Sequence, residues 1–293
     1  MREFEIKARG KLNLGLDVTG VRQDGYHLVR MVMQTVRLSD SLVFTKTRGS
    51  DITIRTNLRY LPVNENNLIY KAVELVRNEY GISDGIRVEL EKHIPVAAGM
   101  AGGSADAAAA LKAMNRLFGL GIGDDALAGM GLRLGADVPY CLMGGTALAE
   151  GIGEELTPLK AVPEADVVLV KPNFSISTAE VYRELDSLPS APHPDIDGML
   201  EAIKAGDLAG ICGKFGNILQ TVSAQKYPVI EDIRQQLLEF GAVNSLMSGS
   251  GPTVFAIFND RKKAEHAYYH FKGGEFGRNT FLTGFWRQDG RRA

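Results

Sequence analysis

Apolar and polar residues alternate along several segments of the chain, mostly in its first hundred residues. The clearest are residues 3–7 and 12–18, where every second residue is apolar, and shorter stretches follow at 42–44, 52–54 and 86–90. A period of two places alternate side chains on opposite faces, which is typical of a strand with one buried face. The sequence therefore predicts strands in these five segments.

Other segments have apolar residues at helical spacing. Residues 66–80 follow this pattern up to Gly81, and an alanine-rich segment runs from about residue 105 to Phe118, with Gly119 beyond it. Glycine after the last turn is a common helix stop. A further helix is expected over about 124–134, before Gly135. Residues 136–139 are expected to be non-helical because they contain a proline.

The second half of the chain mixes both patterns. Composition changes near residues 157–165, between Pro158 and Pro163. Ser177-Thr178-Ala179-Glu180 has the form of a helix capping box. Strands are expected at 144–151, 167–170, 243–247, 253–258 and 281–286, and helices at 197–222, 229–240 and 262–271. We therefore predict an α+β fold of two domains, residues 1–160 and 161–293.

Composition excludes several classes of protein. The 293 residues carry 33 basic and 35 acidic side chains, a net charge of −2, which is too little positive charge to hold nucleic acid electrostatically. We see no apolar run long enough to span a membrane and no signal-peptide core. Cys141 and Cys212 have no partners at metal or redox spacing. We expect a cytoplasmic protein without nucleic-acid or membrane partners, whose cysteines are buried thiols.

A loop of small residues is the most informative feature. Residues 95–105 read Pro-Val-Ala-Ala-Gly-Met-Ala-Gly-Gly-Ser-Ala and lead directly into the alanine-rich helix. Backbone N–H groups at such a helix start can hold phosphate. A tight turn packed for space alone explains the glycines equally well. The loop matches neither the P-loop nor the dinucleotide-binding fingerprint.

Three polar positions are candidates for chemistry. Lys11 and Asn13 share the face opposite the leucines of the strand at 12–18, and Asp137 follows a helix stop. A carboxylate can accept a hydroxyl proton, and an ammonium can bind an anion. The pattern alone favours a solvent-facing lysine and a turn-capping aspartate. In Asp24-Gly25-Tyr26-His27, the pattern alone favours Tyr26 in the core and His27 at the surface.

Three segments together resemble the GHMP kinase superfamily. They are Lys11-Leu12-Asn13-Leu14, the loop from Pro95 to Ala105, and Ser248-Gly249-Ser250-Gly251-Pro252-Thr253-Val254-Phe255. The resemblance covers essentially the whole chain. It implies an N-terminal domain like ribosomal protein S5 that binds ATP, and a ferredoxin-like C-terminal domain. Asp24-Gly25-Tyr26-His27 and Gly135-Ala136-Asp137-Val138-Pro139 resemble the branch that acts on a CDP-linked methylerythritol.

The resemblance implies an activity and a role for each matching residue. The activity is ATP-dependent phosphorylation of the substrate's 2-hydroxyl, with Mg²⁺, in the non-mevalonate route to isoprenoid precursors. Asp137 would be the base and Lys11 its cationic partner, while Asn13, Tyr26, His27 and Tyr182 would bind substrate. The residues implied for ATP are Pro95, Val96, Ala97, Ala98, Gly99, Met100, Ala101, Gly102, Gly103, Ser104, Ala105, Asn67 and Lys92.

The chain departs from the superfamily pattern in places, and other functions stay open. Arg9-Gly10 replaces a usual Pro-Ala, and Ala101 replaces a usual glycine. One alternative is a kinase of homoserine, mevalonate or another small alcohol, although such a substrate needs no stacking aromatic pair. Another is a non-catalytic nucleotide-binding module. The sequence gives no metal ligands, and it is compatible with a monomer or a weak homodimer.

Overall fold

The computed structural model describes residues 2–287 and divides the chain into two compact units. Unit 1 comprises residues 1–10, 39–96 and 101–143, and unit 2 comprises residues 11–38, 97–100 and 144–293. Strands β1 (Glu3–Val21) and β2 (His27–Thr47) contribute residues to both units. The units thus interleave along the chain, and a domain boundary at residue 160 stays a prediction.

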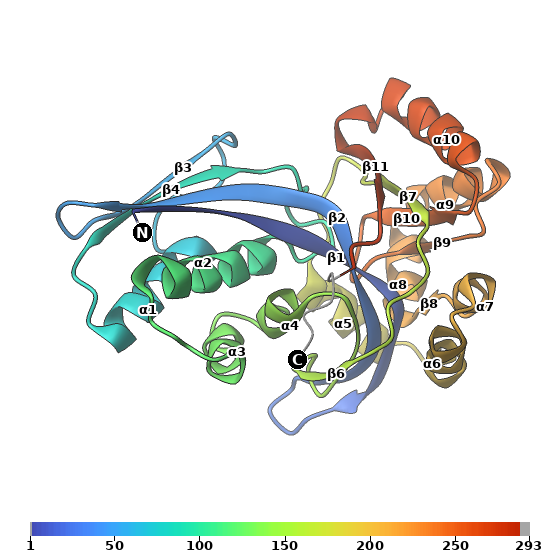
Figure 1. The fold of residues 1–293 in the computed structure, drawn as a ribbon. Coiled ribbons are helices and arrows are strands. Elements are labelled where there is room, and N and C mark those ends of the chain that lie inside the picture. The colour runs from blue at the N-terminus through green and yellow to red at the C-terminus, as the bar shows by residue number, and fades with distance from the viewer. Residues whose placement is uncertain (1, 288–293) are drawn as a thin grey trace. The chain divides into compact units, whose positions relative to one another are not determined.

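Unit 1 is a sheet with helices packed on one face (Figure 1). Strand β3 (Ile52–Thr56) pairs in parallel with β4 (Gly85–Glu91), which pairs antiparallel with residues 41–47 of β2. The helices are α1 (Leu68–Tyr80), α2 (Gly102–Phe118), α3 (Asp124–Leu132) and α4 (Val138–Met143). Helix α2 packs against α1. Five of its residues between 105 and 110 are buried alanines, and their small side chains allow a close approach of the two helices.

The first part of unit 2 continues from strands β1 and β2. Residues 31–34 of β2 pair antiparallel with β5 (Thr146–Glu150), which pairs with β6 (Glu155–Pro158). Gly15 and Leu16 of β1 pair in parallel with the two-residue strand β8 (Gly216–Asn217). The leucines of β1 are buried, as their alternation predicts.

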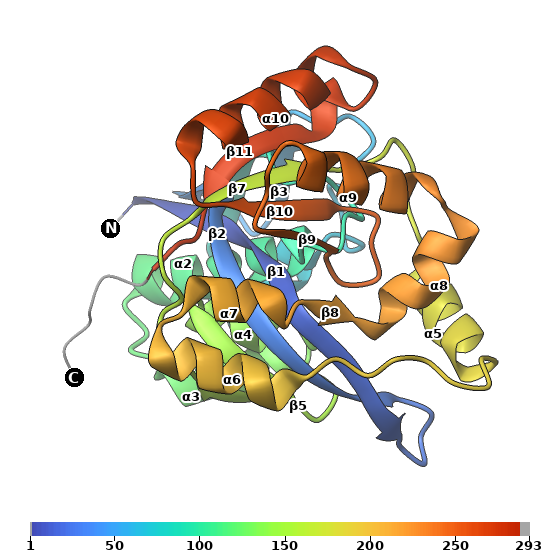
Figure 2. The same cartoon turned by 90° about the vertical axis from the view of Figure 1, so that its right-hand side faces the viewer.

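The second part of unit 2 is an antiparallel sheet of four strands in the order β11-β7-β10-β9. These are β7 (Asp166–Val170), β9 (Asn244–Met247), β10 (Val254–Phe258) and β11 (Thr280–Gly284). Helices α9 (Val229–Glu239) and α10 (Arg261–Gly273) pack against this sheet (Figure 2). Every residue of β10 is buried, which explains its uninterrupted apolar sequence.

Four shorter helices of unit 2 lie between β7 and α9. They are α5 (Thr178–Asp186), α6 (Ile196–Ala205), α7 (Leu208–Gly213) and α8 (Ile218–Lys226). The helix start at Ser177 is confirmed, since its side chain caps α5 by accepting a hydrogen bond from the Glu180 N–H. The expected single helix over 197–222 is wrong. Gly206 ends α6 in the left-handed conformation, and β8 separates α7 from α8.

The α+β class is confirmed, whereas some local expectations are wrong. Strands β1 and β2 are far longer than the alternating segments at 12–18 and 42–44. Tyr26 is 60% exposed and not part of the core. Cys212 is buried, which raises the pKa of its thiol to about 12 and makes it unreactive, while Cys141 is half-buried. Across residues 2–287 we find no helix with the length and apolarity needed to cross a bilayer.

Candidate functional site

Residues 97–100, the first part of the glycine-rich loop, are packed against strand β1 within unit 2. The Lys11 N–H donates to the Met100 carbonyl at 3.0 Å. The Ser248 hydroxyl donates to the Gly99 carbonyl at 3.0 Å and accepts from the Asn13 N–H at 3.3 Å. Ser248 belongs to the third of the segments that resemble the kinase superfamily, and it contacts the first through Asn13 and the second through Gly99. The structure brings all three together.

Only glycine fits at position 99. Its φ is +72°, and a Cβ built there would lie 2.1 Å from the Ser248 carbonyl oxygen. Such a contact cannot be relieved by turning a flexible side chain, because the neighbouring atom belongs to the backbone. The glycine is therefore needed both for its backbone conformation and for close approach to the 248–251 turn.

Buried polar side chains of unit 2 hold the 248–251 turn in place. The Asn217 side-chain amide donates to the carbonyls of Met247 and Gly249, each at 2.8 Å. The Ser223 hydroxyl donates to the Ser250 carbonyl at 3.1 Å. These bonds fix a turn without regular secondary structure in one conformation, which in turn fixes the loop that packs on it.

Lys11 and Asn13 form a buried polar pair on β1. The Lys11 ammonium donates to Asn13 Oδ1 at 2.8 Å, and Lys11 is only 5% exposed. The solvent-facing lysine that the pattern favours is therefore wrong. A buried ammonium is costly unless it meets polar or anionic groups. This environment suits a lysine that binds an anionic ligand.

The start of α2 in unit 1 has the properties of an anion-binding helix end. Its N-cap residue, Ala101, has a φ of +53° and makes no side-chain cap, and its first turn contains no acidic residue. The first N–H groups of a helix have no partners inside the helix, and they lie at the positive end of its dipole. Residues 102–104 therefore present donors suited to phosphate.

Beneath this helix start, Lys92 is buried between two carboxylates. Its ammonium donates to Asp40 at 2.5 Å and to Asp106 at 2.7 Å, and the Lys92 side chain is only 3% exposed. A Cβ added to Gly102 would lie 3.3 Å from this ammonium. Asp40 also accepts the N–H groups of His93 and Ile94. The cluster therefore connects the end of β4 and strand β2 to the first turns of α2.

Burial shifts the protonation of this cluster. It raises the pKa of Asp106 to about 8, against the attraction of Lys92 and with the added repulsion of Asp40. Burial also disfavours the Lys92 ammonium, but the attraction of Asp106 and Asp40 outweighs it and raises the pKa of Lys92. Asp106 Oδ1 has no hydrogen-bond partner among residues 2–287. Asp106 is thus the carboxyl group of this cluster whose protonated form burial favours.

Asn67, like Lys92, is implied near the nucleotide and makes contacts within the protein. Its side chain caps α1 by accepting the Ile69 N–H at 2.9 Å, and it donates to the Pro62 carbonyl at 2.7 Å. The side chains of Asn67 and Lys92 thus have structural contacts within unit 1. Direct contact of either with a nucleotide stays a prediction.

Asp137 lies in unit 1, in the turn before α4. Its carbonyl accepts the Cys141 N–H at 3.0 Å, which is the first hydrogen bond of that helix. Val138 and Pro139 belong to α4, so the expectation of a non-helical segment over 136–139 is wrong at these two residues. Proline is tolerated in the first turn because no N–H is needed. Lys11 belongs to unit 2, and its pairing with the half-buried Asp137 stays a prediction.

Three of the residues implied in substrate binding lie in unit 2: Tyr26 just before β2, His27 at its start, and Tyr182 in α5. The ring of His27 stacks on Tyr182 with centroids 4.4 Å apart, and Tyr26 beside it is exposed. His27 Nε2 is hydrogen-bonded to Asp186 Oδ1 at 2.8 Å. The sequence pattern missed Asp186. The one available signal was its helical spacing of four residues from Tyr182.

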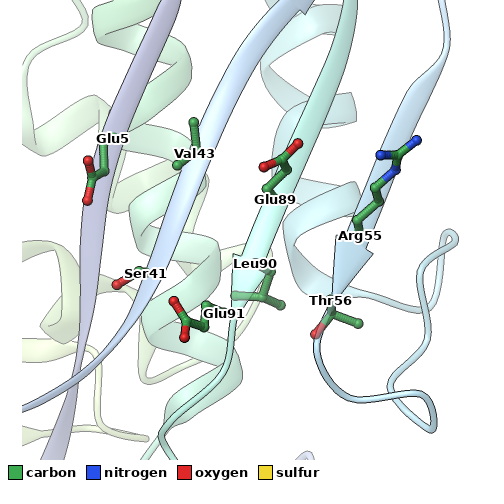
Figure 3. Close-up of a pocket in the computed structure, with 8 residues that line it drawn as sticks. All are labelled: Glu5, Ser41, Val43, Arg55, Thr56, Glu89, Leu90 and Glu91. Carbon is green, nitrogen blue, oxygen red and sulfur yellow. The ribbon is translucent and has the colours of Figure 1, made fainter.

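A separate hollow of about 520 Å³ lies on the sheet of unit 1 (Figure 3). Its lining comprises Glu5, Ser41, Val43, Arg55, Thr56, Glu89, Leu90 and Glu91. It includes none of the residues predicted for catalysis or binding. Its three carboxylates are Glu5 on β1 and Glu89 and Glu91 on β4, and no group of three or more candidate metal ligands is found in residues 2–287.

The Asp40–Lys92–Asp106 cluster predicts a pH dependence of stability. Between pH 3.8 and about 8, the folded protein keeps a proton on Asp106 that the unfolded chain releases. The free energy of unfolding should therefore fall as pH rises through this window, by at most about 1.4 kcal/mol per pH unit. Urea unfolding of Asp106→Asn at several pH values should show a smaller decrease of the free energy of unfolding with pH, because asparagine stays neutral.

Asp40→Asn is the matched comparison for this prediction. It removes one of the two carboxylates that contact the buried Lys92 ammonium, so it should cost about 3–5 kcal/mol at neutral pH. Asp106→Asn should instead become more stable relative to wild type as the pH rises from 3.8 towards about 8, because asparagine needs no proton to stay neutral. If the free energy of unfolding changed equally with pH in wild type and in Asp106→Asn, Asp106 would not titrate in this range.

Ala101→Gly should stabilise the protein. Alanine at a φ of +53° is strained, and glycine adopts this conformation freely. The free energy of unfolding should rise by about 0.5–1 kcal/mol. Ala126→Gly, at an exposed position of α3, should instead lower it by about 1 kcal/mol. A loss of stability in Ala101→Gly would contradict the strained backbone at this loop.

Two family models match this chain. The N-terminal domain of GHMP kinases matches residues 67–145, and the C-terminal domain of GHMP kinases matches residues 194–273. The first match contains α2 and Asp137. The second contains β8 and the 248–251 turn that holds the loop.

Individual relatives agree with these models. The chain is 52% identical to the 4-diphosphocytidyl-2-C-methyl-D-erythritol kinase of Lachnoclostridium phytofermentans, over 96% of this chain and 97% of that protein. It superimposes on a crystal structure of 4-(cytidine 5'-diphospho)-2C-methyl-D-erythritol kinase with a TM-score of 0.82 and 30% identity, covering 97% of this chain and all of that one. A homoserine kinase from Cytophaga hutchinsonii, at 20% identity and a TM-score of 0.75, shares the fold over 97% of this chain and 94% of its own. The chain therefore belongs to the 4-diphosphocytidyl-2-C-methyl-D-erythritol kinase family, within the GHMP kinases.

Proposed function

We propose that this chain transfers the γ-phosphoryl group of ATP to the 2-hydroxyl of 4-(cytidine 5'-diphospho)-2-C-methyl-D-erythritol, with Lys11 and Asp137 as catalytic residues. The reaction follows from membership in the family, and it is a step of the non-mevalonate route to isopentenyl diphosphate. The loop that carries Gly99, packed by Ser248 against β1, is the structural observation that best supports it.

Phosphoryl transfer depends on positioning and charge neutralisation more than on covalent chemistry by the protein. The uncapped start of α2 provides N–H donors and a positive dipole end for the phosphates. The metal enters as part of the Mg·ATP substrate. Nucleotide-bound Mg²⁺ keeps several water ligands and needs only one or two protein ligands, so a dedicated cluster of ligands is not required.

The two proposed catalytic residues have different tasks. The Lys11 ammonium, already desolvated on β1, neutralises charge on the transferred phosphoryl group. Asp137 orients the 2-hydroxyl and accepts its proton as the new oxygen–phosphorus bond forms. The bond from the γ-phosphorus to the β–γ bridging oxygen breaks, and ADP leaves with that oxygen.

The aromatic group of unit 2 supports a nucleotide-linked acceptor. Tyr26, His27 and Tyr182 would hold the cytosine by stacking and by hydrogen bonds to its edge. Asn13 would bind the substrate next to Lys11. A mevalonate or homoserine kinase needs no such ring pair, and the homoserine kinase likeness extends to the fold alone. A cytoplasmic location and a monomeric or weakly dimeric state stay predictions.

A coupled ADP-release assay tests this function. With ATP, Mg²⁺ and the CDP-linked substrate, Asp137→Asn should lower kcat by about 10²- to 10⁴-fold, since it keeps the shape of the residue but removes the base. Lys11→Met should lower kcat by about 10²-fold or more. Lys7→Met is the control, because Lys7 is an exposed lysine on the same strand and should leave kcat unchanged.

Three results would contradict the proposal. Near-normal kcat with an unchanged pH profile in Asp137→Asn would exclude the base. Equal rates with mevalonate or homoserine would point to a small-alcohol kinase. Calorimetric binding of ATP without turnover of any alcohol would favour a non-catalytic nucleotide-binding module.

A further inference from the structure

The structure contains a three-residue arrangement around His27 that the family assignment does not explain. Helix α5 presents two residues to the same imidazole, four positions apart on one side of the helix. Tyr182 stacks on the ring with an interplanar angle of 29°, and Asp186 binds its Nε2 at 2.8 Å. Stacking sets the plane of the ring, and the hydrogen bond sets its rotation within that plane.

We propose that Asp186 is a positioning residue that fixes which nitrogen of His27 carries the proton, and that it thereby makes the site select an amino-bearing base over a keto-bearing one. The proposal rests on the proposed contact of His27 with the edge of the substrate base. It adds a residue that determines specificity and that touches neither the substrate nor the reacting atoms.

The chemistry of the Asp186 carboxylate carries the argument. An ionised carboxylate only accepts hydrogen bonds, so Nε2 must hold the proton and donate it. In the neutral imidazole, Nδ1 then has a lone pair and only accepts. The hydrogen bond made by one ring nitrogen thus decides what the other nitrogen can recognise.

An acceptor at Nδ1 discriminates between the two pyrimidines. The 4-amino group of cytosine donates hydrogen bonds, whereas the 4-oxygen of uracil accepts them. Nδ1 can therefore bind cytosine and repels uracil at the same position. A binding site strongly rejects a ligand that leaves one of its polar groups without a hydrogen-bond partner or places a second acceptor against it.

The place of Asp186 on its helix supports a task of this kind. It is the last residue of α5, where the negative end of the helix dipole disfavours a carboxylate. The two glutamates of the same helix, Glu180 and Glu184, are paired with Lys226. Asp186 instead binds His27, which precedes it by 159 positions and whose side chain is only 13% exposed. Helix stability does not account for this carboxylate.

Substrate discrimination tests the proposal. The ratio of kcat/KM for the CDP-linked substrate to that for its UDP-linked analogue should fall at least about tenfold in Asp186→Asn. The asparagine amide can donate as well as accept, so it no longer imposes one tautomer. The change should come from KM for the CDP-linked substrate, with kcat at saturation little altered. Glu184→Gln makes the same change of charge two residues away and should leave the ratio unchanged.

A second measurement reports on the ring directly. Nitrogen-15 NMR of the protein without substrate should show His27 protonated at Nε2 in the wild type and in Glu184→Gln. Asp186→Asn should show a larger Nδ1–H population. A wild-type Nδ1–H tautomer, or a discrimination ratio unchanged by Asp186→Asn, would overturn the proposal.

His27→Ala separates this proposal from the one on which it depends. If His27→Ala raises KM for the CDP-linked substrate while Asp186→Asn keeps the wild-type ratio, only the role of Asp186 is wrong. If His27→Ala leaves KM unchanged, His27 does not contact the base, and both assignments fail. Absence of turnover by the wild type would contradict the proposed function itself.

Discussion

The close approach of Gly99 to the Ser248 carbonyl is the constraint on which the rest of unit 2 depends. The two backbones leave no room for a Cβ, and the Ser248 hydroxyl joins the loop to β1 as well. Three segments that lie far apart in the sequence thereby share one arrangement. Lys11, whose N–H binds the carbonyl of Met100, takes its place from the same contacts.

Buried charges are the second theme of the structure. The Lys92 ammonium lies between Asp40 and Asp106 beneath the start of α2. The Lys11 ammonium, on β1, donates to Asn13 Oδ1. Burying an ammonium is costly, and in both places polar or charged groups of the protein offset that cost.

Local patterns in the sequence predicted what local forces determine. The helix start at Ser177, the helix stop at Gly81 and the alternation in β1 are decided by neighbouring residues, and the structure has all three. Pro139 was misleading because a proline is unfavourable inside a helix but harmless in its first turn. Tyr26 was misleading because large apolar rings are usually buried. The contact of His27 with Asp186 had no local signal beyond the spacing of Asp186 from Tyr182, since the two residues are 159 positions apart in the sequence.

The most direct test of this account is calorimetric titration of ATP into Gly99→Ala. Substitution should displace the loop from the Ser248 carbonyl and weaken ATP binding at least about tenfold. Binding of the CDP-linked substrate should persist, because the contacts of His27 with Tyr182 and Asp186 do not involve the loop. Wild-type affinity for ATP in a folded Gly99→Ala protein would contradict the claim that this contact builds the nucleotide site.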